Sequence, residues 1–320
     1  MADVPEVTPI AAKFDVSAAI HANDFMFLWH LGPDPSRWPE TRQQATDYYF
    51  NDGARSAAHL DELVAELHFD HTKRPLRLLE FASGYGMVSR HLGRMKERYA
   101  LTACDIHQQA IEFLRTEIGV EAVLSRTDPD DLVLPGNFDV IFALSFFSHV
   151  PHRTWGRWLR KLYSALANDG LLIFTTHGQG GHDRAGRPQF LPEGYWFAVS
   201  SEQGDLGPED YGTVLVEPFY VFQHIERCEE ASMVLFSGAS WWGDQDTYVV
   251  RKAPRSFHRR LSPRREGDTT NQRVAGLKAE NRALRDTIDA IHASHSWRLT
   301  APMRGLASKL IKASMWKRGT

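Results

Sequence analysis

Residues 76–86 read LRLLEFASGYG, and this stretch constrains the fold of the chain most strongly. An apolar run closes on the acidic residue Glu80, and a turn of small residues that contains Gly84 and Gly86 follows it. This pattern is typical of a buried parallel strand that leads through a loop into a helix. Glycine suits such a loop because it lacks a Cβ, which allows the backbone to approach a ligand closely.

A second apolar run, residues 99–104, ends in Asp105. An acid about 20 residues beyond a glycine turn is placed to bind ribose hydroxyls. The glycine pattern alone also occurs in strand-to-helix turns that bind nothing, and its spacing, E-x-A-x-G-x-G, differs from the dinucleotide pattern G-x-G-x-x-G. Two strands that each close on an acid nevertheless predict a nucleoside site at the carboxyl edge of a sheet.

With these markers the chain resembles the class I S-adenosylmethionine-dependent methyltransferases, over most of its first 252 residues. Glu80, Ala82, Gly84 and Gly86 occupy the positions of that family's first motif, with alanine in place of its first glycine. Residues 137–144 resemble the fourth strand, and residues 159–174 resemble the helix, turn and fifth strand. The resemblance implies a Rossmann-like α/β fold. Its sheet has seven mostly parallel strands, an antiparallel last strand and helices on both faces.

The resemblance also implies S-adenosyl-L-methionine as the cofactor. Asp105 matches the acid that holds both ribose hydroxyls in the family, and Asp128 matches the acid that reads the adenine edge. Tyr49 belongs to a segment that covers the cofactor in related enzymes, as does its neighbour Tyr48. The expected cofactor-binding residues are Tyr49, Glu80, Ala82, Ser83, Gly84, Gly86, Asp105, Ile106, Asp128, Pro129, Leu144 and Ser145.

Three histidines are candidates for a general base, because an oxygen acceptor loses its proton during or after methyl transfer. His149 and His177 are the preferred catalytic residues, and His152 is a third candidate; each is expected near the carboxyl edge of the fourth or fifth strand. A histidine at position 149 also has a structural role in many proteins of this fold. The sequence contains no H-E-x-x-H or comparable signature, so we predict no metal.

Composition agrees with a globular enzyme. The chain has 320 residues, of which 42% are hydrophobic, and this is enough for one sizeable core and an appendage. Two cysteines, Cys104 and Cys228, indicate no disulfide framework and favour a reducing cytoplasm. Residues 1–9 contain acids and prolines without an apolar run, which predicts neither a signal peptide nor a membrane span.

We divide the chain into an N-terminal helical segment (residues 1–54) and a methyltransferase domain (residues 55–252). Within this domain, residues 178–230 form a substrate-side insertion. Such long insertions are usually functional. The aromatic cluster at residues 195–197 is expected either to stack on a sugar ring or to form the insertion's own small core. The segment at residues 25–30 is apolar enough to be core or an oligomer contact.

The net charge of −3 hides an asymmetry. Residues 255–320 hold fifteen Lys and Arg against five Asp and Glu. We read residues 253–271 as a basic linker, residues 272–296 as a short coiled coil and residues 297–320 as a basic amphipathic tail. The coil seam spans residues 274–291, with Asn281 at a polar core position, and suggests a homo-oligomer. A single helix packed on its own domain is the alternative.

The tail at residues 297–320 has an apolar face and positive charges, which fits either a peripheral contact with the inner face of the plasma membrane or docking on protein, including a glycosyltransferase partner. Nucleic acid is not an expected partner, because no recognition module accompanies the charge. The coil and the S-x-S-W-R-x-T-x-P segment resemble tails of bacterial enzymes that build surface polysaccharides. This resemblance covers about 45 residues.

The resulting hypothesis is a cytoplasmic methyltransferase that methylates a sugar hydroxyl in a bacterial glycan or polysaccharide intermediate. Two alternatives stay open. The first is O- or N-methylation of a small metabolite, with the tail serving only assembly. The second is a non-catalytic scaffold of a glycan-assembly complex. The retained acids and glycines at positions 80, 84, 86, 105 and 128 argue against the scaffold.

Overall fold

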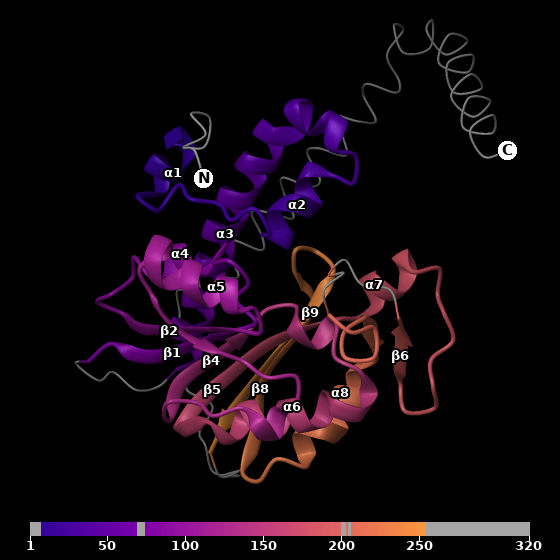
Figure 1. The fold of residues 1–320 in the computed structure, drawn as a ribbon. Coiled ribbons are helices and arrows are strands. Elements are labelled where there is room, and N and C mark those ends of the chain that lie inside the picture. The colour runs from indigo at the N-terminus through magenta and orange to yellow at the C-terminus, as the bar shows by residue number, and fades with distance from the viewer. Residues whose placement is uncertain (1–7, 69–73, 200–202, 204–205, 254–320) are drawn as a thin grey trace, which may run out of the picture. The chain divides into compact units, whose positions relative to one another are not determined.

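The computed structural model describes residues 8–68, 74–199, 203 and 206–253, all of which belong to one compact unit (Figure 1). The linker beyond residue 253, the coiled coil and the basic tail lie outside the described residues. Within the described part, no helix combines the length and the apolar character needed to cross a membrane.

The central sheet has seven strands in the order β3-β2-β1-β4-β5-β9-β8. β9 runs antiparallel to both of its neighbours, and the other adjacent pairs are parallel. The mostly parallel sheet with an antiparallel last strand is thus confirmed. The strands are β1 (Leu76–Phe81), β2 (Tyr99–Asp105), β3 (Glu121–Leu124), β4 (Phe138–Ala143), β5 (Leu166–His177), β8 (Ala231–Trp241) and β9 (Gln245–Lys252).

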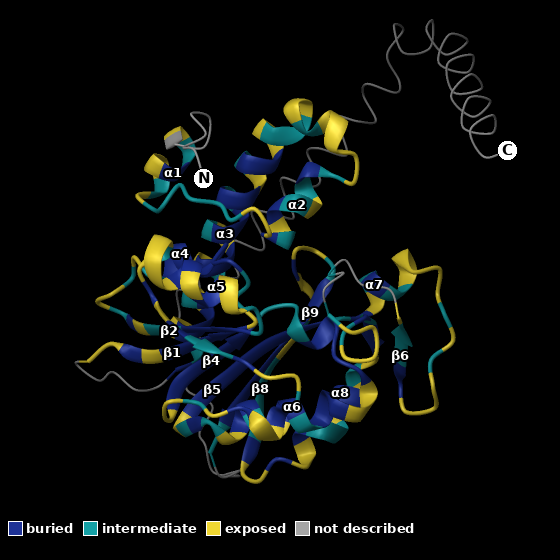
Figure 2. Ribbon diagram, viewed as in Figure 1, coloured by how far each residue is buried: buried dark blue, intermediate teal, exposed yellow. Residues whose placement is uncertain are grey.

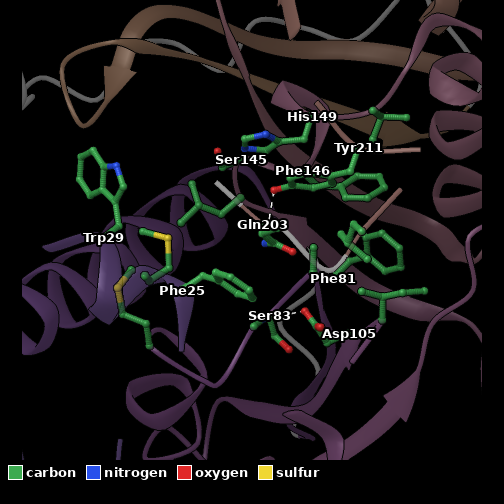
Figure 3. A pocket seen from close by; sticks show the side chains of 18 of the residues that line it. Phe25, Trp29, Phe81, Ser83, Asp105, Ser145, Phe146, His149, Gln203 and Tyr211 are labelled. Atoms are coloured by element: carbon green, nitrogen blue, oxygen red, sulfur yellow. Dashed lines mark hydrogen bonds between the residues drawn. The ribbon is translucent and has the colours of Figure 1, made fainter. Parts of the chain in front are cut away.

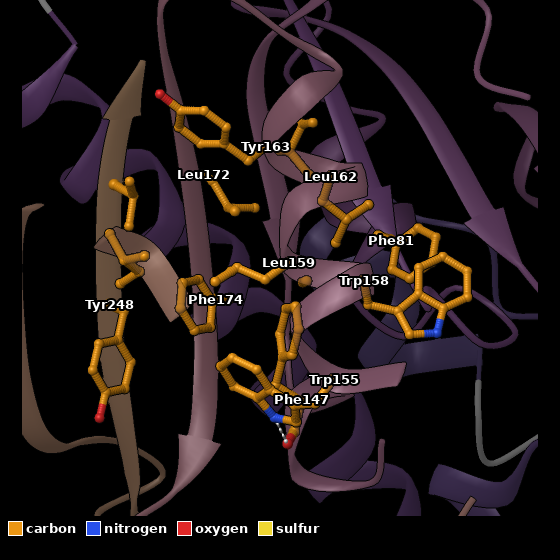
Figure 4. Packing of buried hydrophobic residues seen from close by; sticks show 14 of the residues in the cluster. Phe81, Phe147, Trp155, Trp158, Leu159, Leu162, Tyr163, Leu172, Phe174 and Tyr248 are labelled. Atoms are coloured by element: carbon orange, nitrogen blue, oxygen red, sulfur yellow. Dashed lines mark hydrogen bonds between the residues drawn. The ribbon is translucent and has the colours of Figure 1, made fainter. Parts of the chain in front are cut away.

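Alternate residues of the strands face two separate cores, as the twofold periodicity of a strand requires. On one face, Leu79, Ile141 and Phe174 pack against α6 (His152–Ser164) and α8 (Pro218–Glu226), around the buried Trp155 (Figure 4). On the other face, Leu78 and Phe142 pack against α3 (Trp38–Leu67). The central strands are therefore buried on both sides (Figure 2), which explains their continuous apolar runs.

Short elements complete the unit. The N-terminal layer adds α1 (Thr8–Phe14), α2 (Phe25–Leu31) and the 3-10 turn η1 (Pro35–Arg37). The helical segments between the strands include α4 (Ser89–Leu92), α5 (Gln108–Phe113), the π-helical turn η2 (Leu114–Ile118), and the 3-10 turns η3 (Pro129–Asp131) and η4 (Phe146–Ser148). Residues 178–230 contain α7 (Gln179–Arg184), a two-stranded sheet of β6 (Tyr195–Ala198) and β7 (Thr213–Val216), and α8.

One boundary differs from expectation. Residues 54 and 55, between which we placed a domain boundary, both lie inside α3, which continues without a break from Trp38 to Leu67. The aromatic cluster at residues 195–197 begins β6, and Tyr195 is buried in the core shared with α6 and α8.

Arg90 ties the N-terminal layer to the turn after β1. Although it is only 3% exposed, its guanidinium donates to the carbonyls of Ser17, Ala19 and Gly86. It also donates to the hydroxyl of Tyr49, which in turn donates to the carboxylate of Asp24 at 2.6 Å. Asp24 caps α2 by accepting the amide of Phe27. One buried cation therefore fixes both the turn and the start of α2.

We expect Arg90→Met to lower the free energy of unfolding by about 3–5 kcal/mol, because it leaves buried carbonyls and the buried Asp24 without their cation. Urea denaturation measures this change. Arg94→Met is the matched control: Arg94 pairs with the exposed Asp15, and an exposed pair contributes about 0–1 kcal/mol. Equal losses for the two variants would contradict the structure.

Candidate functional site

A cavity of about 780 Å³ lies at the carboxyl edge of the central strands. Its floor comes from the residues that follow β1, β2 and β4, and its walls come from α2, α3, α7, Gln203, residues 206–215 and the turn between β8 and β9. Figure 3 shows Ser83 and Asp105 near Phe25 of α2, and His149 near Tyr211. Open sheets of parallel strands commonly bind ligands at the carboxyl ends of the strands. Of the residues expected at the cofactor site, the cavity is lined by Glu80, Ala82, Ser83, Gly84, Asp105, Ile106, Leu144 and Ser145, together with both preferred histidines, His149 and His177.

The turn after β1 takes a left-handed backbone at Ala82 (φ 57°) and Gly84 (φ 55°). This conformation is costly for a residue with a Cβ, so the replacement of the family glycine by Ala82 places strain at the cavity floor. The amide of Gly84 donates to the carboxylate of Asp105 at 2.8 Å. This bond joins the first turn to the end of β2.

Asp105 is buried and well connected. Besides the Gly84 amide, it accepts the backbone amide of His107 at 3.0 Å and contacts the His107 ring at 2.8 Å. A carboxylate has about four accepting positions, so these contacts leave one for a ligand hydroxyl. A second hydroxyl would be accepted if the His107 ring turned away from Asp105.

Glu80 lies below the turn and accepts a hydrogen bond from the Ser89 hydroxyl at 2.6 Å. Burial raises the pKa of Glu80 to about 8, and the nearby Asp105 carboxylate adds to the rise. Glu80 is therefore largely protonated at neutral pH in the empty site. A cationic ligand beside it would favour the carboxylate form.

The two histidines meet at the opposite wall. Their ring centroids are 6.0 Å apart, and the His149 ring stacks on Tyr211 at 4.5 Å. The Nδ1 of His149 lies 2.8 Å from the carbonyl of Gly212; because a carbonyl only accepts, neutral His149 carries its lone pair on Nε2. Burial lowers the pKa of His177 to about 4, with a contribution from His149, so His177 is neutral at physiological pH.

Four expected cofactor residues do not line the cavity. Tyr49 points into the core and bonds to Asp24 and Arg90, whereas its neighbour Tyr48 lines the cavity. Gly86 is needed for packing instead, since a Cβ there would lie 2.9 Å from Leu114.

The other two of the four are Asp128 and Pro129. Asp128 caps η3 and pairs with Arg157 at 2.6 Å, and Pro129 is buried within η3. Residues 125–127, just upstream, face the cavity. His152, the third histidine, contacts the Tyr220 hydroxyl at 3.0 Å and is not among the lining residues.

Sequence reasoning missed part of the wall. The apolar segment of α2, left open as core or oligomer contact, contributes Phe25, Met26, Trp29 and His30 to the cavity. Its apolar character was visible, but its position depends on the long-range Arg90 network. Other missed lining residues come from distant segments and carry no local motif: Asp52, His107, Arg184, Gln203, Asp210, Trp242, Asp244 and Gln245. Within the described residues, no group of three or more His, Cys, Asp or Glu side chains is arranged to hold a metal.

The raised pKa of Glu80 predicts a pH-dependent stability. Between pH 4.5 and about 8, the folded protein keeps a proton on Glu80 that the unfolded chain has lost. The free energy of unfolding therefore falls as pH rises through this window, by at most about 1.4 kcal/mol per pH unit. Urea denaturation across the window should show this slope in the wild type and a shallower one in Glu80→Gln. Parallel slopes would show that Glu80 does not titrate there.

Residues 79–172 match the family model of a methyltransferase domain. Malonyl-[acyl-carrier protein] O-methyltransferase of Bacillus cytotoxicus is 28% identical over 141 residues, which cover 41% of this chain and 45% of the relative. A probable fatty acid methyltransferase of Pseudomonas putida is 26% identical over 131 residues, which cover 38% of this chain and 32% of the relative. The chain thus spans less than half the length of these relatives.

Among solved structures, the fold is similar to an S-adenosylmethionine-dependent methyltransferase from Clostridium acetobutylicum, with a TM-score of 0.45 and 12% identity over 62% of this chain and 90% of that one. The N-methyltransferase NodS from Bradyrhizobium japonicum gives a TM-score of 0.43 and 13% identity over 78% and 98%. The matched family model spans the motif turn and the strands β1 to β5 at the floor of the cavity. Residues 79–172 are therefore similar to a methyltransferase domain, and they lie in a mostly parallel, Rossmann-like sheet.

Proposed function

We propose that this protein transfers the methyl group of S-adenosyl-L-methionine to a hydroxyl oxygen of a small acceptor, and that the acceptor is a sugar unit of a glycan intermediate. The observation that carries the proposal is one cavity with two unlike walls. The β1–β2 wall presents buried acids and the turn amides, whereas the β4–β5 wall presents two imidazole rings, those of His149 and His177. A donor and an acceptor bound at these walls would face each other.

The β1–β2 wall fits the nucleoside part of the cofactor. Asp105 retains an accepting position for a ribose hydroxyl, and Glu80 would lose its proton beside the cationic end of the cofactor. Bound there, the cofactor supplies an activated methyl group on a sulfonium. S-Adenosylmethionine and S-adenosylhomocysteine appear in the names of several structural neighbours. Lining residues from α2, such as Phe25 and Met26, add apolar surface to the cavity.

His149 is the best candidate for the base. The Gly212 carbonyl fixes its Nδ1–H, so Nε2 is the atom that would accept the proton of an acceptor hydroxyl. The stacked Tyr211 ring holds the imidazole plane in place. His177 stays neutral and therefore does not oppose the protonation of His149. Positioning by these rings and removal of a proton are the contributions that the chain itself makes.

A carboxylate acceptor is the second candidate. The relatives from Bacillus are named malonyl-[acyl-carrier protein] O-methyltransferase, and Arg126 and Arg184 line the cavity. A carboxylate is already ionised at neutral pH and needs no base. The role of His149 therefore separates the two candidates.

Calorimetry with S-adenosyl-L-methionine tests the cofactor assignment. We expect the wild type to bind and Asp105→Ala to bind about a hundredfold more weakly or worse, because charge-assisted hydrogen bonds to the ribose are lost. Asp128→Ala is the matched control. Since Asp128 lies outside the cavity, its removal should change the affinity little. Failure of the wild type to bind would remove the proposed function.

The role of the base is tested by measuring methyl transfer to methyl pyranosides and to a malonate half-ester. The release of S-adenosylhomocysteine serves as the readout. With a hydroxyl acceptor, His149→Ala should lower kcat by about a hundredfold. With a carboxylate acceptor, the variant should retain its rate. A wild-type rate for His149→Ala with a hydroxyl acceptor would exclude the proposed base.

A further inference from the structure

We propose that Trp242 and Asp244, on the turn between β8 and β9, form a subsite that binds the ring of a polyhydroxylated acceptor, a pyranose. The inference rests on the proposed function and specifies the acceptor of the same cavity. Both residues line the cavity, on a wall separate from the motif turn after β1.

The turn holds Trp242 in a backbone conformation that tryptophan rarely adopts. Trp242 (φ 54°) and Gly243 (φ 76°) are both left-handed, and the Asp244 amide donates to the Trp241 carbonyl at 3.1 Å. Tight hairpin turns of this kind favour Asn-Gly at the two central positions. A bulky aromatic residue persists in such a position only when its surroundings fix it, and outliers of this kind concentrate at ligand sites.

A hydrogen bond to α3 fixes the side chain of Trp242. Its indole N–H donates to the carboxylate of Asp52 at 2.6 Å, and Asp52 is buried on α3. The residue is nevertheless 36% exposed, and two further exposed aromatic residues, Trp29 and Tyr48, line the same cavity. A rigid indole plane with an exposed surface provides a platform for the apolar C–H face of a sugar ring.

Asp244 supplies a polar contact beside this platform. One carboxylate oxygen pairs with Arg184. The other, Oδ1, is shielded from solvent and has no hydrogen-bond partner in the part of the chain that the structure describes. A buried acceptor atom without a partner is costly, and a ligand hydroxyl would satisfy it.

The position of Asp244 links this subsite to the reaction. Asp244 lines the same cavity as Tyr48 and His177 and acts electrostatically on both of them. An acceptor at this position would place one hydroxyl on Asp244 and another toward His149. A ring with one hydroxyl would leave Oδ1 of Asp244 unsatisfied, and a carboxylate acceptor has no hydrogen to donate to it. A neutral ring with several hydroxyls can stack on Trp242, donate one hydrogen bond to Asp244 and direct another hydroxyl toward His149.

The test uses the full chain and measures methyl transfer to a panel of methyl pyranosides (glucose, mannose, galactose and rhamnose configurations), with catechol as a planar acceptor. Trp242→Asn removes the platform while supplying a residue that suits the turn, so the variant should fold. Asp244→Ala removes the polar contact. Each should raise the KM for a pyranoside about tenfold or more, with little change in kcat and an unchanged cofactor affinity.

Matched controls come from outside the cavity. Phe219→Asn changes an exposed aromatic residue on α8, and Asp183→Ala removes a carboxylate that pairs with Arg187 on the surface. Both should leave the KM unchanged. An unchanged KM in Trp242→Asn and Asp244→Ala would overturn the subsite.

The acceptor profile separates the two levels of the proposal. Turnover of catechol without turnover of any pyranoside would overturn the sugar subsite and keep hydroxyl methylation. Turnover of a malonate half-ester alone, or of no acceptor despite cofactor binding, would overturn both.

Discussion

The hydrogen bond from the Gly84 amide to the Asp105 carboxylate is the interaction on which the rest of the site depends. It requires β1 and β2 to run parallel and to end together, which their register from Leu76–Tyr99 to Phe81–Cys104 achieves. It also orients the carboxylate toward the cavity, because one oxygen is held by the turn and the other by His107. The turn and the acid therefore form one rigid unit before any ligand binds.

The N-terminal layer extends this unit across the top of the cavity. Arg90 follows the motif turn and binds the Gly86 carbonyl together with the carbonyls of Ser17 and Ala19, in the irregular segment that precedes α2. The cap on α2 then fixes the helix whose residues cover the β1–β2 wall. The Arg90 guanidinium therefore connects the turn after β1 with the α2 residues that line the cavity. The β8–β9 turn, where we place the acceptor ring, is fixed in a similar way, since Asp52 on α3 accepts a hydrogen bond from the indole of Trp242.

Much of the fold was predictable because its signals are local. Apolar runs that end in acids, a glycine turn and the order of the strands identify a parallel sheet, and the observed topology agrees. The site was predictable where a residue lies at the carboxyl end of a strand or a few positions beyond it, as Ser83, Asp105, Ser145 and His149 do. Tyr49 and its neighbour Tyr48 could not be separated from sequence, because which of two adjacent helical residues faces the cavity depends on how α3 packs.

The remaining differences have the same physical origin. Asp128 matches the family position, yet Arg157 on α6 holds it away from the cavity, and a pairing between distant elements has no sequence signature. The sequence of the β8–β9 turn likewise did not indicate a role in the site. Its sequence, WWGD, resembles an ordinary hairpin, and its significance emerged from the left-handed Trp242 and from the contact with a helix 190 residues upstream.

A crystal structure of the protein with S-adenosylhomocysteine tests the central claim most directly, which is that one cavity brings a cofactor wall and an acceptor wall together. The account predicts ribose hydroxyls on Asp105, the thioether sulfur directed toward His149 and His177, and open space between the sulfur and Asp244. A ligand bound outside this cavity, or a sulfur that faces away from the histidine wall, would contradict it.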